Sequence, residues 1–209
     1  MSTTESVRPA RAWALALLCA GATFLAPGPL GGGAERAAAS EPFATYSLGA
    51  RDLRIGNRGT DVRTLNWALR SQALSTLYHG AFDGTTHRAV RALQQNAGLP
   101  ADGVVRRETR KTLASRMLNH KATWYGPGLW GNRTACGQKL KKKTIGVAHR
   151  KLPCGTRVAF AHQGRWVHAR VIDRGPFRKG YRWDLTKRLA KRLGVIRKGT
   201  AVLKVGVAP

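Results

Sequence analysis

Acidic residues are scarce in this sequence. Its 209 residues contain only 10 Asp and Glu against 37 Lys and Arg, which gives a formal net charge of +27. No run of about 18 or more apolar residues occurs, so the sequence predicts no membrane-spanning helix. Hydrophobic residues make up 43% of the chain, which excludes a wholly disordered protein. A chain of this charge is attracted to nucleic acid, to an anionic membrane or to anionic cell-wall polymers, and charge alone does not choose among them.

Several functional patterns are also missing. The six histidines form no tight cluster with Cys or Asp, so the sequence predicts no metal site. No Ser-His-Asp arrangement and no Gly-rich phosphate loop is recognisable. We therefore expect neither a metal nor a cofactor.

The first forty residues have the features of an export signal. Arg8 and Arg11 precede an apolar run over residues 12–26, and the alanines at 37–39 have the small-x-small spacing of a cleavage site. This order predicts a secretory signal, cleaved just after those alanines. A buried helix is the alternative, but its Gly- and Pro-rich flank offers nothing to pack against. We assign residues 1–40 to a signal peptide and a flexible N-terminal segment.

The chain has three cysteines, and their positions support export. Cys19 lies inside the apolar run and would leave with it; lipidation there is disfavoured because Leu18 is bulky where a small residue is expected. Cys136 and Cys154 remain as an even pair, which predicts one disulfide in an exported protein. Two reduced core thiols are the alternative. The disulfide would close a loop of about 18 residues and contribute about 3 kcal/mol in the chain-entropy model.

The balance of charge changes along the chain. Residues 41–120 hold six acids and twelve Lys and Arg, whereas residues 121–209 hold 22 Lys and Arg but only two acids, Asp173 and Asp184. The change lies near His120 and predicts a domain boundary with a very short linker. We expect one domain over residues 46–118 and a second over 121–209.

The first domain is predicted to be helical. Three groups of apolar residues recur at helical spacing: Val62, Leu65 and Leu69; Val90, Leu93 and Ala97; Leu113 and Met117. Thr60-Asp61 is a typical helix start, Thr85-Thr86 precede the second helix, and Gly98 is expected to end it. Three short helices in about 70 residues form a small bundle with a thin core.

The turns of this domain resemble those of a known family. The residues concerned are Gly56-x-x-Gly59-x-Asp61-Val62-x-x-Leu65, Phe82-Asp83-Gly84-x-Thr86-x-x-Ala89-Val90, Gln94, and Gly98-Leu99-x-x-Asp102-Gly103-Val104-x-x-x-Thr109. They are similar to a peptidoglycan-binding domain of the three-helix type, and the resemblance covers about residues 50–117. It departs from the family pattern before Gln94, where the usual aromatic is absent, and at Arg106, where Gly is common. A helical spacer that binds nothing is the alternative.

The second domain is predicted to be a β-structure. Residues 156–162 and 165–173 alternate and are rich in β-branched residues, and Gln163-Gly164 between them is a hairpin signal. Residues 201–207 form a closing strand. Leu185, Leu189 and Leu193 form one helical stripe that ends at Gly194. Several short strands with one helix predict a small closed barrel.

Two carboxylates stand out against the basic background of this domain. Asp173 ends a predicted strand, and Asp184 opens the predicted helix. Asp184 could simply favour the helix dipole, and Asp173 could pair with a neighbouring arginine. The functional alternative is acid and base catalysis, because a glycosidic oxygen leaves readily only when a carboxylic acid protonates it.

Other candidate site residues surround these two acids in the sequence. His149 lies just upstream of Cys154, so a disulfide would help to fix its position. The second domain is dense in aromatic residues, and Trp124-Tyr125-Gly126 is a glycine-flanked stretch that is expected to line a loop. Exposed rings there could stack on sugar faces or on bases.

The second domain carries the more specific resemblance. Its motifs are Ala122-Thr123-Trp124-Tyr125-Gly126, Thr134-Ala135-Cys136-Gly137, Val147-Ala148-His149, Leu152-Pro153-Cys154-Gly155-Thr156-x-Val158, Val171-Ile172-Asp173-Arg174-Gly175-Pro176-Phe177 and Trp183-Asp184-Leu185-Thr186. Together they resemble the double-psi β-barrel of the rare-lipoprotein-A family, a barrel that expansins share. The resemblance implies a two-domain α + β protein, in which a small three-helix bundle precedes a six-stranded double-psi β-barrel with one or two short helices.

The resemblance also implies a function. Members of this family that are lytic transglycosylases cleave peptidoglycan glycan strands without water and leave 1,6-anhydro ends. By this resemblance the catalytic residues are Asp184, Asp173 and His149, and the substrate-binding residues are Trp124, Tyr125, Thr134, Gln138, Arg174 and Trp183. Gln138 stands where many members carry Glu, and an amide cannot transfer the catalytic proton. The alternative is therefore an expansin-like module that binds glycan and loosens the wall without cleaving it.

The expected partners and location follow from both resemblances. We expect a secreted bacterial protein associated with the cell wall, with no transmembrane helix in its mature form. Its partners would be peptidoglycan glycan strands and anionic wall polymers. Nucleic acid is not expected, because the export signal and the two wall-domain resemblances count against it.

Overall fold

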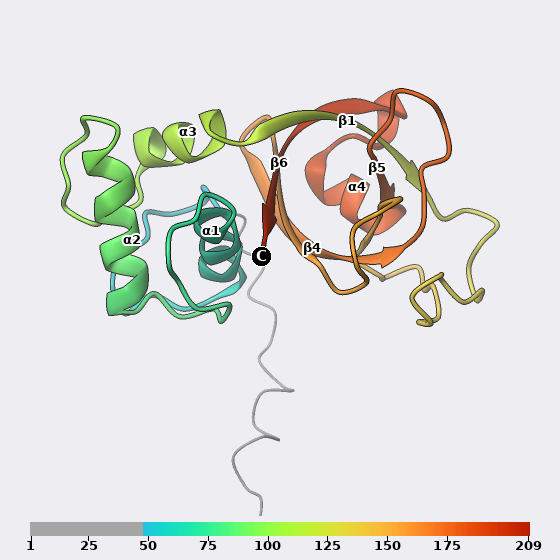
Figure 1. Ribbon diagram of the computed structural model, residues 1–209, viewed down its shortest axis with the longest axis horizontal. Coiled ribbons are helices and arrows are strands. Elements are labelled where there is room, and N and C mark those ends of the chain that lie inside the picture. The colour runs from blue at the N-terminus through green and yellow to red at the C-terminus, as the bar shows by residue number, and fades with distance from the viewer. Residues whose placement is uncertain (1–47) are drawn as a thin grey trace, which may run out of the picture. The chain divides into compact units, whose positions relative to one another are not determined.

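The computed structural model describes residues 48–209 of the 209-residue chain (Figure 1). The predicted export signal in residues 1–40 lies outside the described residues. Within the described part, no helix combines the length and the apolar character that a membrane crossing requires.

The first part of the described chain contains the three predicted helices. They are α1 (Thr60–Arg70), α2 (Gly84–Gln95) and α3 (Arg107–Ser115). Helix α2 begins one turn earlier in the sequence than expected, because Asp83 caps it by accepting a hydrogen bond from the Thr86 amide at 2.9 Å. It also ends earlier than expected: Gln95 is its last residue, and Gly98 takes its left-handed conformation beyond the helix.

The Asp-Gly turn after α2 is held by one buried glutamine. Gln94 accepts a hydrogen bond from the Gly103 amide at 2.9 Å and donates one to the Val104 carbonyl at 3.0 Å. Gly103 has a φ of 74°, and a Cβ there would lie 2.1 Å from the His87 ring, so only glycine fits. The motif residues of this domain therefore have a structural reason for their spacing.

The second part is a closed barrel of six strands, as predicted. The strands are β1 (Leu118–Tyr125), β2 (Val147–Ala148), β3 (Arg157–His162), β4 (Arg165–Asp173), β5 (Trp183–Thr186) and β6 (Ala201–Ala208). They pair in the order β1-β5-β2-β4-β3-β6 and close between β6 and β1. The pairs β1–β5 and β2–β4 are parallel, and the others are antiparallel. The predicted hairpin joins β3 to β4, and its turn residues Gln163 and Gly164 both have positive φ.

The barrel also contains helix α4 (Lys187–Leu193) and a 3₁₀ turn over Ile196–Lys198. The prediction placed Leu185 and Asp184 at the start of this helix, but both lie in β5. Helix α4 begins only after Thr186, whose hydroxyl caps it by accepting from the Leu189 amide. Asp184 is therefore a strand residue, and a helix-capping role for it is excluded.

Helix α1 shares a hydrophobic cluster with the barrel. Ala159, Ala161 and Trp166 of β3 and β4 belong to the same buried cluster as the helix residues, including Trp67. The Trp67 ring lies 4.6 Å, centroid to centroid, from the ring of His168 on β4. The linker after α3 is only two residues long, so the helices continue directly into the wall of the barrel.

His168 is the one titratable group buried in this contact that has a strongly shifted pKa. The Thr64 hydroxyl donates its single hydrogen to the Thr60 carbonyl, so its oxygen accepts from Nδ1 of His168 at 2.9 Å. Nδ1 therefore carries a proton, so the neutral ring is the Nδ1–H tautomer. Burial, and after it the charges of nearby arginines, lower the pKa of His168 to about 4.

We expect His168 to make the protein less stable as the pH falls from 6.5 toward 4. In that range the unfolded chain takes up a proton that the folded chain refuses, so the free energy of unfolding falls, by up to about 3 kcal/mol. The measurement is urea denaturation of wild type and His168→Asn at pH 7, 5.5 and 4. The difference in the free energy of unfolding between wild type and variant should shrink as the pH falls. A difference that stays constant with pH would contradict the lowered pKa of His168.

Candidate active site

The two candidate acids come together because strand β2 lies between β4 and β5. Ala148 of β2 pairs with Asp173 of β4 on one side and with Asp184 of β5 on the other. Neighbouring strands lie about 4.8 Å apart, so the two Asp Cα atoms are separated by roughly 10 Å. Trp183 and Leu185 on either side of Asp184 are buried in the barrel core, which directs Asp184 to the outer face.

Asp173 is held by backbone amides. Its Oδ1 accepts hydrogen bonds from the amides of Ala135 at 2.8 Å and of Arg174 at 2.9 Å. The predicted alternative, an ion pair with a neighbouring arginine, does not form: the Arg174 guanidinium contacts the Asp173 carbonyl and the Cys154 sulfur instead. The carboxylate therefore has a fixed position and retains an oxygen, Oδ2, for another partner.

Asp184 lies in a different environment. Its Oδ1 atom is buried, and no hydrogen bond to it is found. Burial raises the pKa of Asp184 to about 6, and the negative charge of Asp173 contributes to the increase. Two neighbouring carboxylates with different surroundings are the arrangement that separates an acid from a base.

Two further polar atoms near this pair are buried without a partner. They are the hydroxyl of Tyr125, on β1, and the hydroxyl of Thr134, in the loop that follows β1. Burial raises the pKa of Tyr125 above its ordinary value, and the nearby charges of Asp173 and Asp184 raise it further, so the hydroxyl keeps its proton. A buried polar group without a partner costs about 1–3 kcal/mol, which indicates that these atoms bind an external group.

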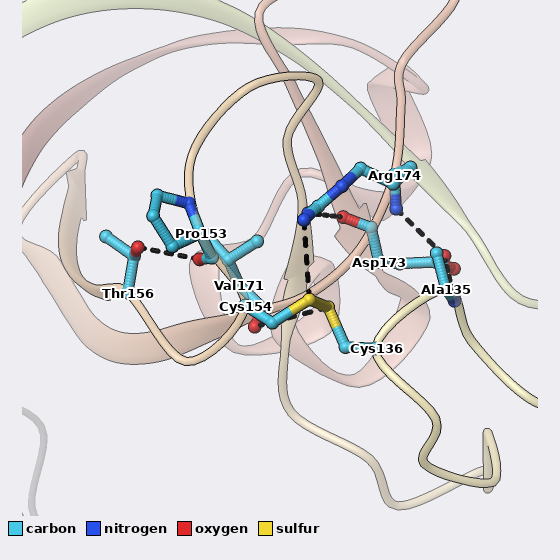
Figure 2. The surroundings of a disulfide bond; sticks show 8 residues. All are labelled: Ala135, Cys136, Pro153, Cys154, Thr156, Val171, Asp173 and Arg174. Atoms are coloured by element: carbon cyan, nitrogen blue, oxygen red, sulfur yellow. Dashed lines mark hydrogen bonds between the residues drawn. A yellow bond between two sulfur atoms is a disulfide. The ribbon is translucent and has the colours of Figure 1, made fainter.

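The predicted disulfide is present and supports this loop. Cys136 and Cys154 are bonded, with Cα atoms 5.7 Å apart. Figure 2 shows Ala135 and Asp173 beside the disulfide, with Arg174 reaching the Cys154 sulfur at 3.4 Å. The disulfide thus ties the loop that donates to Asp173 to the loop that follows His149.

The His149 ring bonds to backbone amides and packs against Trp183, and no hydrogen bond from the ring to either carboxyl group is found. Its Nδ1 accepts from the amides of Lys151 at 3.1 Å and Leu152 at 3.0 Å, so any ring proton is on Nε2. Burial lowers the pKa of His149, and the charges of Arg182 and other cations lower it further. Its ring lies 4.5 Å from that of Trp183, centroid to centroid. The structure therefore places it as a neutral residue beside the core.

The other predicted site residues are spread over several environments. Trp183 is only 1% exposed and donates Nε1–H to His120, so its ring is not available to stack on a sugar. Trp124 is partly buried and packs against the barrel core. Gln138 is exposed, and its backbone carbonyl accepts from the Thr134 amide at 2.8 Å.

Sequence reasoning missed one exposed aromatic residue close to Asp173. Phe177 is 84% exposed and follows Asp173 by four residues. Its position after Gly175-Pro176, outside any alternating run, was the available signal that the ring is not a core residue. An exposed ring there can stack on a sugar face.

Two family comparisons match separate parts of the chain. Residues 118–205 match the family described as lytic transglycolase, and residues 58–113 match the putative peptidoglycan binding domain. These ranges correspond to the barrel and to the three-helix part.

Individual relatives match less than half of the chain. A probable endolytic peptidoglycan transglycosylase RlpA of Synechocystis is 43% identical over 76 residues, which cover 35% of this chain and 24% of that protein. The endolytic peptidoglycan transglycosylase RlpA of Campylobacter jejuni is 38% identical over 88 residues, covering 41% and 32%. An expansin of Clavibacter michiganensis, solved with cellohexaose, has a TM-score of 0.38 at 17% identity, covering 44% of this chain and 50% of that one.

The chain spans about a quarter to a third of the length of these curated relatives. The family matches and the closed six-stranded barrel nevertheless agree in residue range and in architecture. Residues 58–113 are therefore similar to a peptidoglycan-binding domain, and the closed six-stranded barrel is similar to the double-psi β-barrel of the RlpA-like lytic transglycolase family.

Proposed function

We propose that the protein is a secreted, cell-wall-associated lytic transglycosylase. Residues 1–40 direct export, the domain over residues 46–118 binds peptidoglycan, and the domain over 121–209 cleaves the glycan strand to form 1,6-anhydro-muramyl ends. The observation that carries this proposal is the environment of Asp184. This half-buried residue has an unpartnered carboxyl oxygen and a raised pKa, and it neighbours the Asp173 carboxylate, which backbone amides hold in place.

The proposed reaction uses Asp184 first as an acid. Protonated Asp184 gives its proton to the glycosidic oxygen, and the bond from that oxygen to the anomeric carbon breaks. The C6 hydroxyl oxygen of the same sugar attacks the anomeric carbon and closes the 1,6-anhydro ring. Its proton passes to Asp184 or Asp173, so the carboxyl pair is restored and no water is consumed.

The neighbouring residues have supporting roles in this proposal. The unpartnered hydroxyls of Tyr125 and Thr134 bind hydroxyl or acetamido groups of the sugar. Gln138 contributes an exposed amide where relatives of the family carry an acid, so acid and base work rests on Asp173 and Asp184. His149 supports the position of Trp183 and hence of β5.

The second candidate function is an expansin-like module that binds and loosens glycan without cleaving it. Gln138 favours this alternative, because it removes one carboxylate from the site. The two functions differ in their product, because only the transglycosylase generates new anhydro ends.

We expect binding to peptidoglycan to survive salt that removes simple charge attraction. At about 0.5 M salt the screening length falls below about 5 Å, so the net charge of +27 no longer acts at a distance. Sedimentation of full-length protein with purified peptidoglycan should persist, whereas retention on the polyanion heparin should be lost. Loss of both at the same salt concentration would identify a generic basic adhesive.

Asp184→Asn should abolish cleavage while making the folded protein more stable. A general acid of this kind typically raises the reaction rate by about 10²–10⁴-fold. The loss is measured by mass spectrometry as the amount of anhydro-muropeptides released. Because the pKa of Asp184 is raised, its charge destabilises the folded state above pH 6 and has no effect below the unfolded pKa of 3.8. The variant should therefore gain about 1 kcal/mol at pH 7 and little at pH 3.5. Wild-type activity should decline as the pH rises through about 6.

Those two readouts separate catalysis from architecture. If Asp184 has only a structural role, the Asp184→Asn variant should be less stable than wild type, and its folded fraction should still cleave glycan. If wild type itself releases no anhydro ends from peptidoglycan, the transglycosylase proposal fails and the expansin-like alternative replaces it.

Tyr125→Phe should weaken the interaction with glycan without destabilising the protein. The substitution deletes a hydroxyl that has no hydrogen bond of good geometry within the protein and interacts with the Asp173 carboxylate nearby, so the melting temperature should change little. The loss of a hydrogen bond to the substrate should lower kcat/KM by about 10-fold. A fall in melting temperature with unchanged kcat/KM would show that the hydroxyl serves the fold instead.

A further inference from the structure

The positive charge of the barrel is not neutralised within the described chain. Among residues 48–209, every ion pair with a carboxylate lies between Arg51 and Lys111, in the helical part. The barrel carries 22 Lys and Arg over residues 121–209, and its two acids form none of these pairs. An external anion is the natural partner for cations of this kind.

Some of these cations converge on one pocket. The pocket has a volume of about 360 Å³ and is lined by His149, Arg150, Lys151, Gly180, Tyr181 and Arg182. We call it the arginine pocket. None of its lining residues is acidic.

The arginine pocket lies beside the acid pair. Ala148 of β2 pairs with Asp184 of β5. The segment that follows β2 and the segment that precedes β5 remain in contact, because the Arg150 guanidinium donates to the Tyr181 carbonyl at 3.2 Å. Arg182 precedes Asp184 by two residues, a step of at most about 7 Å. A group bound there is therefore within reach of the bond that Asp184 protonates.

The positive charges of the arginine pocket also lower the pKa values of two neighbouring histidines. After burial, the charge of Arg182 is the next cause that lowers the pKa of both His120 and His149, and Arg150 lowers that of His149 further. Burial and the nearby cations both favour the neutral form of these histidines. The local potential therefore favours an anion.

We propose that the arginine pocket binds an oxyanion carried by the glycan strand, on a sugar next to the cleaved bond. The proposal rests on the glycan-cleaving function proposed above and assigns it a determinant of specificity. Planar guanidinium groups match the geometry of carboxylate and phosphate oxygens. The pocket would thus select anionic wall glycan over a neutral chain of N-acetylglucosamine with the same type of backbone.

The test measures binding in the Asp184→Asn background, so that ligands are not cleaved. Dissociation constants are compared for soluble wall glycan strands and for neutral chito-oligosaccharides at about 0.15 M ionic strength, where the screening length is about 8 Å. Arg150→Gln with Arg182→Gln should weaken binding to wall glycan at least 10-fold and leave binding to the neutral chain unchanged.

A matched pair controls for the loss of two charges. Arg197→Gln with Lys198→Gln removes the same charge from the exposed 3₁₀ turn, which does not line the pocket. This control should change neither dissociation constant by more than about 2-fold. Equal losses in the two double variants would overturn the proposal, because they would show a general charge effect.

Chemical treatment of the glycan identifies the anion. One arm removes phosphate-bearing polymers from the strands, and the other converts their carboxylates to neutral amides. The treatment that abolishes the difference between the parent and the Arg150/Arg182 double variant names the bound group. If the difference survives both treatments, or if the double variant binds wall glycan as tightly as the parent, the proposal is wrong.

The outcome is separable from that of the proposed function. Binding is read without turnover, so a protein that releases no anhydro ends would still show whether the arginine pocket recognises an anion. Conversely, wild-type cleavage with an inert arginine pocket would overturn this inference alone.

Discussion

The pairing of one short strand with two neighbours determines the candidate site. Strand β2 has two residues, and its Ala148 is opposite both Asp173 and Asp184. The methyl group of Ala148 is small, so it leaves space between the two carboxyl groups on the outer face. A larger side chain at this position would stand between them. The closed barrel, the hairpin and helix α4 all serve to hold this three-strand arrangement in register.

The site retains polar atoms that the rest of the fold does not satisfy. Hydroxyls of Tyr125 and Thr134 and one oxygen of Asp184 are buried without partners, whereas Asp173 is held by two amides. Each unpaired atom lowers the stability of the free protein, because it has lost water without gaining a hydrogen bond. A substrate that supplies the missing partners recovers this free energy on binding. The disulfide, and the hydrophobic cluster around Trp67 that α1 shares with the barrel, stabilise the surroundings of a site whose own hydrogen-bonding groups lack partners.

Charge is organised differently in the two parts of the described chain. In the helical part, several basic residues form ion pairs with acids, as Arg51 does with Asp61 at 2.9 Å. In the barrel, 22 Lys and Arg accompany only two acids, Asp173 and Asp184, and neither acid forms an ion pair within the described chain. Burial and the repulsion from Asp173 raise the pKa of Asp184. Burial, and after it the charge of Arg182, lower the pKa of His120 and of His149, and the cations leave an unneutralised positive surface beside the site.

Local sequence determined much of this protein. Periodic apolar residues located the three helices, the Gln163-Gly164 turn located the hairpin, and the even pair of cysteines predicted the disulfide. The scarcity of acids singled out Asp173 and Asp184, because two carboxylates in a strongly basic domain are conspicuous. The order of motifs gave the barrel and the peptidoglycan-binding domain, as the family matches agree.

Only the tertiary structure decided how these residues face one another. The leucine stripe predicted a helix through Leu185, yet barrel pairing with β1 and β2 makes that segment a strand and turns Asp184 outward. The same pairing buries Trp183 in the core and places the His149 ring against it. A two-residue strand has no periodicity to detect, and its partners lie far along the chain. The position of β2, and with it the acid pair, is therefore a property of the closed barrel, because only closure specifies which strands β2 joins.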